Sequence, residues 1–223
     1  MISFKRMRFP SEIIMQCIYC YCRYSLSYRD LEEMMKDRGV DVDHSTINDW
    51  VIKFLPQLEV EFRKRKKKVV QVGELMKPIL KVNGKWKYLY RAVDKDGNTI
   101  DFLLTAKRNL KAAKRFFKKA IDNNGTPEKI NIDKSGANKA GIEQYNAENS
   151  SNIEIRQCNY LNNNVEQDHR FIKKIIRSML GFKNFFSGKI TLAGIEIIRM
   201  IKKNQMISSS QDSCFQKFYS LAF

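Results

Sequence analysis

The sequence has no run of about 18 apolar residues, the length at which a segment becomes a candidate to cross a membrane as a helix. The N-terminus also lacks the apolar stretch of a secretory signal peptide. Both absences argue against a helical membrane protein. We therefore expect a soluble, cytoplasmic chain that has no membrane partner.

Cysteine is present but gives no sign of a disulfide framework or a complete metal site. There are 5 cysteines, an odd number, and no secretion signal accompanies them. Cys17 and Cys20 have zinc-knuckle spacing and Cys22 lies close by, but no second Cys or His pair stands at a matching distance. The pattern predicts buried thiols in a helix.

Acidic residues are too few to balance the basic ones. The 223 residues include 41 Lys and Arg but only 24 Asp and Glu, which gives a formal charge of +17 that is spread from end to end. This excess predicts a polyanionic partner, with nucleic acid as the default and a membrane surface as the competitor. The length allows one large or two small domains.

Residues 1–62 are predicted to form an all-α helix-turn-helix domain that binds DNA. Helices are expected over residues 11–24, 28–38 and 46–55, with Ser27 and Asp30 as a capping pair before the second. A tight turn before a third short helix is typical of a helix-turn-helix. A plain three-helix bundle is the alternative, and the charge balance favours DNA binding.

The third helix is expected to start after Ser45 and to stop before Pro56. Its apolar residues share one face, which is predicted to be the core face: Ile47, Trp50, Val51 and Phe54. The opposite face is polar and would meet bases and phosphates, although Asp49 on it would repel phosphate. The candidate DNA contacts of this domain are Arg29, His44, Ser45, Thr46, Asn48 and Lys53.

Residues 63–71 are predicted to be a basic linker. Arg63 to Lys68 are six consecutive basic residues. They form either a solvated linker or a strap that contacts the DNA backbone, and the two interpretations are compatible. Arg63, Lys64 and Arg65 are the candidate contacts.

Residues 72–223 are predicted to form an α/β domain. Asn83-Gly84 is a hairpin turn signal before an aromatic and β-branched strand. Three antiparallel strands followed by alternating helices and strands are the order expected of a ribonuclease-H-like fold, a mixed sheet flanked by helices. The expected strands are 86–93, 99–104, 129–132 and 153–156, and the expected helices are 109–123, one from about 138, and 165–180.

Two carboxylates stand at positions that suit metal-dependent phosphodiester chemistry. Asp133 follows a predicted strand, and Glu166 lies in the first turn of the last predicted helix. Two such groups can share divalent ions, and oxygen ligands favour Mg²⁺ or Mn²⁺. Alternatively, Asn163 and Glu166 form only a capping pair. A basic face follows at helical spacing and predicts phosphate contacts: Arg170, Lys173, Lys174 and Arg177.

Several longer stretches carry a family resemblance. The first two are Ser27-Tyr28-Arg29-Asp30-Leu31-Glu32 and His44-Ser45-Thr46-Ile47. Further along are Gly84-Lys85-Trp86-Lys87-Tyr88-Leu89-Tyr90-Arg91-Ala92-Val93-Asp94, Asn131-Ile132-Asp133, Tyr160-Leu161-Asn162-Asn163, Val165-Glu166-Gln167-Asp168-His169-Arg170 and Thr191-Leu192-Ala193-Gly194-Ile195-Glu196. Together they resemble the DDE-type transposases of the insertion-sequence family typified by IS-six.

The resemblance implies a helix-turn-helix that reads the terminal repeats of an insertion sequence and a ribonuclease-H-like domain that joins 3′-hydroxyl ends to target DNA with Mg²⁺. It also implies a homo-oligomer on double-stranded DNA. Asp133 matches the second member of the family's Asp-Asp-Glu triad and Glu166 matches the third. Both are thereby candidate catalytic residues and candidate metal ligands.

One departure concerns the first triad member. The family has an Asp-Glu-Thr-Tyr-Ile-Lys run where this chain has residues 76–81, and Met76 stands at the position of the Asp. Codons for residues 75–81 can be chosen so that a shifted frame reads Asp-Glu-Thr-Tyr-Ile-Lys, which suggests two compensating frameshifts. Pro78 is also expected to weaken this strand. Glu74 would share a strand face with Met76 and is a poor replacement.

Three functions remain open at this point. In the first, the chain is a transposase, which is either active or inactive with this sequence. It is instead a catalytically dead DNA-binding remnant that competes with active transposases. A third function, a ribonuclease-H-like nuclease unconnected with transposition, is disfavoured by the helix-turn-helix.

Overall fold

The computed structural model describes residues 2–24, 26–69, 73–76, 79–132, 136–157, 174–176, 182–209 and 211–223. The chain divides into two compact units. A helical unit comprises Met1–Lys67 together with Lys174–Phe223, and a sheet unit comprises Lys68–Lys173. Within the described ranges, no helix is long and apolar enough to cross a membrane.

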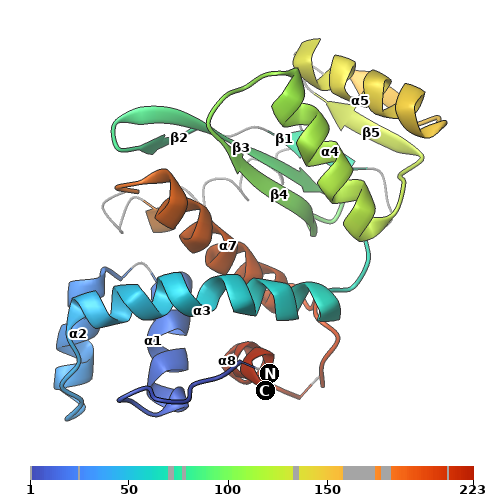
Figure 1. Ribbon diagram of the computed structural model, residues 1–223. Helices are drawn as coiled ribbons and strands as arrows, with labels where there is room; N and C mark the ends of the chain where they lie inside the picture. Colours follow the sequence, from blue (N-terminus) through green and yellow to red (C-terminus); the bar gives the residue numbers. More distant parts are fainter. Residues whose placement is uncertain are drawn as a thin grey trace. The chain divides into compact units, whose positions relative to one another are not determined.

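The helical unit contains the three predicted N-terminal helices and two from the C-terminal part (Figure 1). Before the second helix, the predicted capping pair is confirmed. The Ser27 backbone N–H donates to Asp30 Oδ2 at 2.6 Å, and the Asp30 N–H donates to Ser27 Oγ at 3.2 Å. The helices are α1 (Ser11–Arg23), α2 (Tyr28–Lys36), α3 (His44–Arg65), α7 (Phe185–Lys202) and α8 (Cys214–Tyr219), followed by the short 3-10 helix Ser220–Ala222.

Helix α3 does not stop before Pro56 but continues through it to Arg65, so the predicted end is wrong. An interior proline costs about 3 kcal/mol because it removes one backbone hydrogen bond and crowds the preceding turn. The apolar face continues past it, since Leu58 and Phe62 are buried. Burial of two such side chains contributes about 1.5–3 kcal/mol each, which offsets that cost.

The end of α3 is held by backbone hydrogen bonds instead of opening into a linker. The Ile207 N–H donates to the Arg65 carbonyl oxygen at 2.8 Å, and the Lys67 N–H donates to the Gln205 carbonyl oxygen at 2.8 Å. The predicted linker 63–71 therefore begins as helix and continues as paired backbone as far as Lys67.

The structure divides the chain differently from the expected domains 1–62 and 72–223. Helix α7 packs against α1 and α3, so the C-terminal part of the chain belongs to the helical unit. The reason lies in its composition, because α7 is buried along nearly its whole length from Ile190 to Ile201. A helix that is apolar on most sides needs partners on several sides.

Gly194 marks the closest approach of α7 to its neighbours. A Cβ built there would clash with Cys22 Sγ of α1 and would lie 2.8 Å from Leu55 Cδ1 of α3. Only a residue without a side chain allows this spacing.

We predict that Gly194→Ala destabilises the protein by about 1–3 kcal/mol through overpacking. Chemical denaturation of the full chain measures the change. Gly136→Ala is the matched control, since nothing lies within 4 Å of a Cβ there. Equal stability of Gly194→Ala and Gly136→Ala would contradict this, because α7 could then move away from α1 and α3 without lowering the free energy of unfolding.

The cysteines of α1 are buried free thiols, as predicted. Cys17, Cys20 and Cys22 are all buried and form no disulfide. Burial, and secondarily the neighbouring Cys20, raises the pKa of Cys17 to about 12, so this thiol stays protonated. Protonated thiols pack as small apolar groups and are poor metal ligands.

The sheet unit is a six-stranded mixed sheet with two described helices. Strand β3 is paired on both of its edges: β4 pairs with one edge, while β1 and β2 pair with successive stretches of the other. Next to β1 come β5 and then β6, both parallel. The elements are β1 (Gly73–Met76), β2 (Ile79–Val82), β3 (Lys85–Val93), β4 (Thr99–Thr105), α4 (Leu110–Asn124), β5 (Lys129–Ile132), α5 (Gly136–Asn149) and β6 (Glu154–Gln157).

The predicted hairpin turn at Asn83-Gly84 is confirmed. Both residues have positive φ, 48° and 71°, as a two-residue primed turn requires. From this turn the pairing runs in one register along β3, with Ile79 opposite Tyr88 and Met76 opposite Arg91. Strands β1 and β2 are therefore successive parts of one hairpin arm, on either side of residues 77–78, which lie outside the described ranges and include Pro78.

Helices α4 and α5 cover one face of the sheet (Figure 1). The core beneath them is aromatic and aliphatic, and Tyr90 packs on Phe116 with ring centroids 5.7 Å apart. Leu75 of β1 and Ile132 of β5 belong to the same core. This packing fixes β1 and β5 side by side. The fold is therefore α/β, with the predicted order of strands and helices up to β6.

Candidate DNA-binding and catalytic sites

The first half of α3 has the two faces that the sequence predicts. Its apolar face is buried, with Trp50 only 2% exposed. Phe9 contacts that ring edge-on at a centroid distance of 5.3 Å. On the opposite face Ser45, Asp49 and Lys53 are exposed, while Thr46 and Asn48 are half-buried. The polar face is thus available to a ligand.

The start of α3 is capped by Asp43 and not by Ser45. The Ser45 N–H donates to Asp43 Oδ1 at 2.6 Å, and the Ser45 hydroxyl donates to the same oxygen. These hydrogen bonds lower the pKa of Asp43, with the Ser45 side chain as the largest cause. Ser45 therefore stands in the first turn, where its hydroxyl is already engaged.

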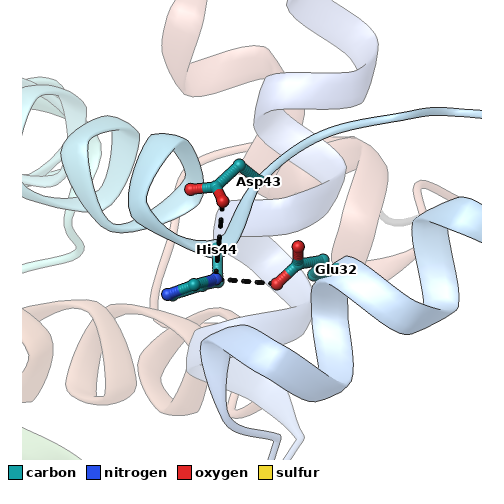
Figure 2. A group of neighbouring side chains, drawn as sticks. All are labelled: Glu32, Asp43 and His44. Atoms are coloured by element: carbon teal, nitrogen blue, oxygen red, sulfur yellow. Dashed lines mark hydrogen bonds and ion pairs between the residues drawn. The ribbon is translucent and has the colours of Figure 1, made fainter.

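His44 lies between two carboxylates at this helix start (Figure 2). Its Nδ1 is 2.8 Å from Glu32 Oε2 of α2 and 3.6 Å from Asp43 Oδ2. The side chains are 43%, 38% and 55% exposed for His44, Glu32 and Asp43. An acidic neighbour therefore faces a residue that the sequence assigns to DNA contact, whereas Arg29 of α2 is exposed.

These three side chains also form a group that offers metal-ligating atoms. One ligand atom of each lies within 4.8 Å of the others, and in the described ranges no further such group of three occurs. The His44–Glu32 hydrogen bond explains this arrangement without a metal ion. Sequence reasoning missed the role of Glu32, because twelve positions and a turn separate it from His44 and no periodicity links them.

The basic run at the end of α3 is partly engaged within the protein. Arg63 Nη2 lies 2.7 Å from Glu59 Oε1, and Lys64 Nζ lies 2.7 Å from Glu61 Oε1. Arg65 Nη1 donates to the Ser220 carbonyl oxygen at 2.7 Å. Lys64 is exposed, and surface ion pairs such as Lys64–Glu61 are weak, about 0–1 kcal/mol, so this pair can give way to phosphate, whereas the Arg63–Glu59 pair is half-buried.

Strands β1 and β5 end at the same edge of the sheet. Strands β1 and β5 are parallel, with Gly73 opposite Ile130 and Glu74 opposite Asn131. Strand β1 ends at Met76, and β5 ends at Ile132. Edges of this kind carry the sites of open α/β sheets.

The two candidate carboxylates are not part of the described structure. Asp133 and Glu166 lie outside the described residues, as do the candidate phosphate contacts Arg170 and Lys173. Arg177 lies outside them too. Lys174 is described, and it is helical and exposed, in agreement with the predicted helix 165–180.

The described residues at this edge do not complete an oxygen ligand set for a divalent metal. Met76 ends the strand at the position where the resemblance calls for an Asp, and a thioether is a poor ligand for Mg²⁺ or Mn²⁺. Glu74 is the one carboxylate residue in β1.

Comparison with known proteins decides the family. Over 91% of its length the chain is 35% identical to the transposase for the insertion sequence-like element IS431mec of Staphylococcus aureus, of which the match covers 90%. The transposase for insertion sequence element IS257 in transposon Tn4003 of the same species matches equally well, with 35% identity. Residues 67–205 match the family model of a DDE domain.

This chain belongs to the IS-six family of DDE transposases.

The sheet unit of this transposase has the arrangement predicted for a ribonuclease-H-like fold: β1 and β2 form one arm that pairs antiparallel with β3, β4 pairs antiparallel with the other edge of β3, and β5 and β6 follow in parallel. The magnesium-bound integrase catalytic core of HTLV-2 aligns with a TM-score of 0.46 and 17% identity, over 69% of this chain and 99% of that one. DDE transposases as a family use divalent metal ions.

We predict that Glu32→Gln tightens duplex DNA binding by roughly 2–5-fold, since it removes a negative charge from the edge of the polar face of α3. Fluorescence anisotropy with labelled duplex at low salt measures the effect. Glu33→Gln, an exposed neighbour on α2, is the matched control. Weaker binding by Glu32→Gln would mean that Glu32 serves DNA binding by orienting His44.

Proposed function

We propose that this chain binds the terminal inverted repeats of an insertion sequence and carries out strand transfer poorly as written. The proposal of poor strand transfer rests on the position of Met76 at the end of β1. The chain is thus a transposase by family that retains DNA binding and has lost efficient strand transfer.

DNA binding is supported by the exposed polar face of α3 and by the formal charge of +17. In a helix-turn-helix, the N-terminal residues of the second motif helix meet base edges in the major groove. We assign this role to Thr46 and Asn48, with phosphate contacts from Arg29, His44 and Lys53, and from Ser45 when its hydroxyl is released from Asp43. Arg63, Lys64 and Arg65 would add sequence-independent contacts along the backbone.

The partners follow from this assignment. Double-stranded DNA supplies both the terminal repeats and the target. Two inverted ends present the same sequence twice, which a symmetric homo-oligomer can hold together. A cytoplasmic location, where bacterial DNA lies, belongs to the same proposal, which rests on the transposases of Staphylococcus aureus that the chain resembles.

We assign Asp133 and Glu166 as the remaining catalytic carboxylates and ligands of Mg²⁺ or Mn²⁺. The support is that β5 ends one residue before Asp133 and pairs in parallel with β1. Glu74 of β1 and Asn131 of β5 are register partners. Met76 and Asp133 each follow one of these partners by the same number of positions in the sequence. The basic residues Arg170, Lys173 and Lys174 would contact phosphates near this pair.

Glu74 does not replace the missing Asp well. It precedes Met76 by two positions, about 6.6 Å in an extended strand. A displacement of about 1 Å in a catalytic group can already cost about 100-fold in rate. A DNA-binding chain without efficient strand transfer would occupy the ends of the insertion sequence and compete with active transposases, which is the alternative function that the same observation favours.

We predict that neutralising residues 63–68 lowers the slope of log affinity against log salt concentration by about 0.9 for each DNA phosphate that these residues neutralise in the parent chain. Binding of a terminal-repeat duplex is measured over a range of salt. Lys36→Gln with Lys95→Gln is the control for the removal of charge from exposed lysines elsewhere. A slope that matches this control would show that the basic run does not bind the DNA backbone.

We also predict that the chain joins terminal-repeat oligonucleotides to target DNA at least about 100-fold more slowly than a version with residues 76–81 rebuilt as Asp-Glu-Thr-Tyr-Ile-Lys. Joined products are counted with Mg²⁺ and with Mn²⁺. A rebuilt version that retains Met76 separates the effect of the missing carboxylate from that of the altered strand. Equal rates for the parent chain and the full rebuild would contradict the assignment of Met76.

A further inference from the structure

Trp86 lies near the tip of the β2–β3 hairpin and is 57% exposed, whereas the other tryptophan, Trp50, is 2% exposed. On β3 it continues a row of side chains that points toward α4. In that row Ala92 and Tyr90 belong to the core and Tyr88 packs partly against it. The row therefore extends one aromatic residue beyond the core.

The hairpin tip extends past the strand that covers the rest of β3. Strand β4 ends at Thr105, which pairs with Tyr88, so Trp86 lies beyond the last pair on that edge. Ile79, the partner of Tyr88 on the other edge, is 44% exposed. Trp86 and Ile79 thus form an exposed apolar surface on the tip, which projects away from α4 in Figure 1.

One cation lies against the Trp86 ring, and a second basic residue is held by its backbone beside the other edge of β3. Lys81 is the cross-strand partner of Trp86, and its Nζ lies 4.8 Å from the ring centroid. On the other edge the Thr105 hydroxyl donates to the carbonyl oxygens of Tyr88 and Lys107, at 3.2 and 3.0 Å. That contact holds the backbone of the exposed residue Lys107 beside β3.

The hairpin also contains no acidic residue. Residues 79–93 include three lysines and one arginine but neither Asp nor Glu. An exposed indole among lysines with no compensating acid is complementary to a polyanion that carries flat aromatic groups. Nucleic acid with an unpaired base has this chemistry, because the base stacks on the ring while the lysines neutralise adjacent phosphates.

We propose that Trp86 is a stacking platform for an unpaired base at a DNA end, with Lys81 and Lys107 as contacts to the flanking phosphates. This inference rests on the proposed function in taking DNA as the partner. It adds a second ligand, single-stranded DNA, and a site in the sheet unit that is separate in sequence from α3. Stacking tolerates any base, so the site has no sequence preference.

The test compares three labelled DNAs of one sequence: a blunt duplex, the same duplex with a short unpaired tail, and the single strand. Anisotropy titrations use the full chain and Trp86→Ala, Trp86→Phe and Phe186→Ala. The last variant removes an aromatic residue that is 65% exposed on α7 and serves as the matched control. Thermal unfolding verifies that each variant is folded.

Trp86→Ala is expected to weaken binding of the tailed duplex and the single strand by about 5–100-fold, with the blunt duplex unchanged. Trp86→Phe should retain most of the affinity, and Phe186→Ala should behave as the parent chain. Lys81→Met should weaken the same two ligands to a smaller extent. Quenching of tryptophan fluorescence by the single strand should disappear in Trp86→Phe, since Trp50 is buried.

Equal affinity of Trp86→Ala and the parent chain for all three DNAs would overturn the proposal. An equal loss of affinity for blunt and tailed duplex would also overturn it, because Trp86 would then contact duplex only. So would a change in sedimentation without a change in binding, which would make the hairpin tip an interface between copies. If the chain bound terminal repeats no better than other duplexes but bound tailed duplex more tightly through Trp86, the proposed function would be rejected and this site would stand.

Discussion

The pairing of β3 on both of its edges is the constraint on which the sheet unit depends. One edge carries β4, and the other carries a hairpin arm whose register is set by the Asn83-Gly84 turn. That register places β1 in the middle of the sheet, between β3 and β5, with Met76 as its last residue. Backbone pairing therefore sets where position 76 lies in the sheet, and the sequence places a methionine at that position. Under the proposed assignment of Met76, the fold persists while its catalytic ligand set is incomplete, because strand pairing needs alternation of side chains and not a carboxylate.

The helical unit depends on a different kind of contact. Helix α7 approaches α1 and α3 so closely that Gly194 is required, and this packing draws the C-terminal part of the chain to the N-terminal helices. The buried face of α3 is thereby held from Ile47 to Phe62, which leaves its polar face outward as a rigid surface. Charge on that surface is mixed, because Glu32 and Asp43 flank His44 among residues that would face phosphate. DNA affinity then depends on the balance between these acids and the exposed cations.

Local signals in the sequence located most elements. The Ser27–Asp30 capping pair, the Asn83-Gly84 turn and the aromatic strand after it all predict what the structure contains, since each acts within a few residues. The end of α3 could not be predicted from Pro56, because distant burial of Leu58 and Phe62 outweighs a local rule. The assignment of α7 to the helical unit and the contact between Glu32 and His44 are equally tertiary. Asp133 and Glu166 follow from the sequence and the family, and they lie outside the described residues.

Whether Met76 stands at a metal-ligand position is tested most directly by counting bound metal ions instead of joined DNA products. Titration with Mn²⁺, followed by electron paramagnetic resonance, compares the chain as written with a Met76→Asp variant in the presence of terminal-repeat DNA. A complete site of this kind holds two ions. If Met76 stands at a metal-ligand position, the variant binds one more tightly held ion than the chain as written. Equal numbers and affinities in the two proteins would contradict it, because position 76 would then lie outside the metal site.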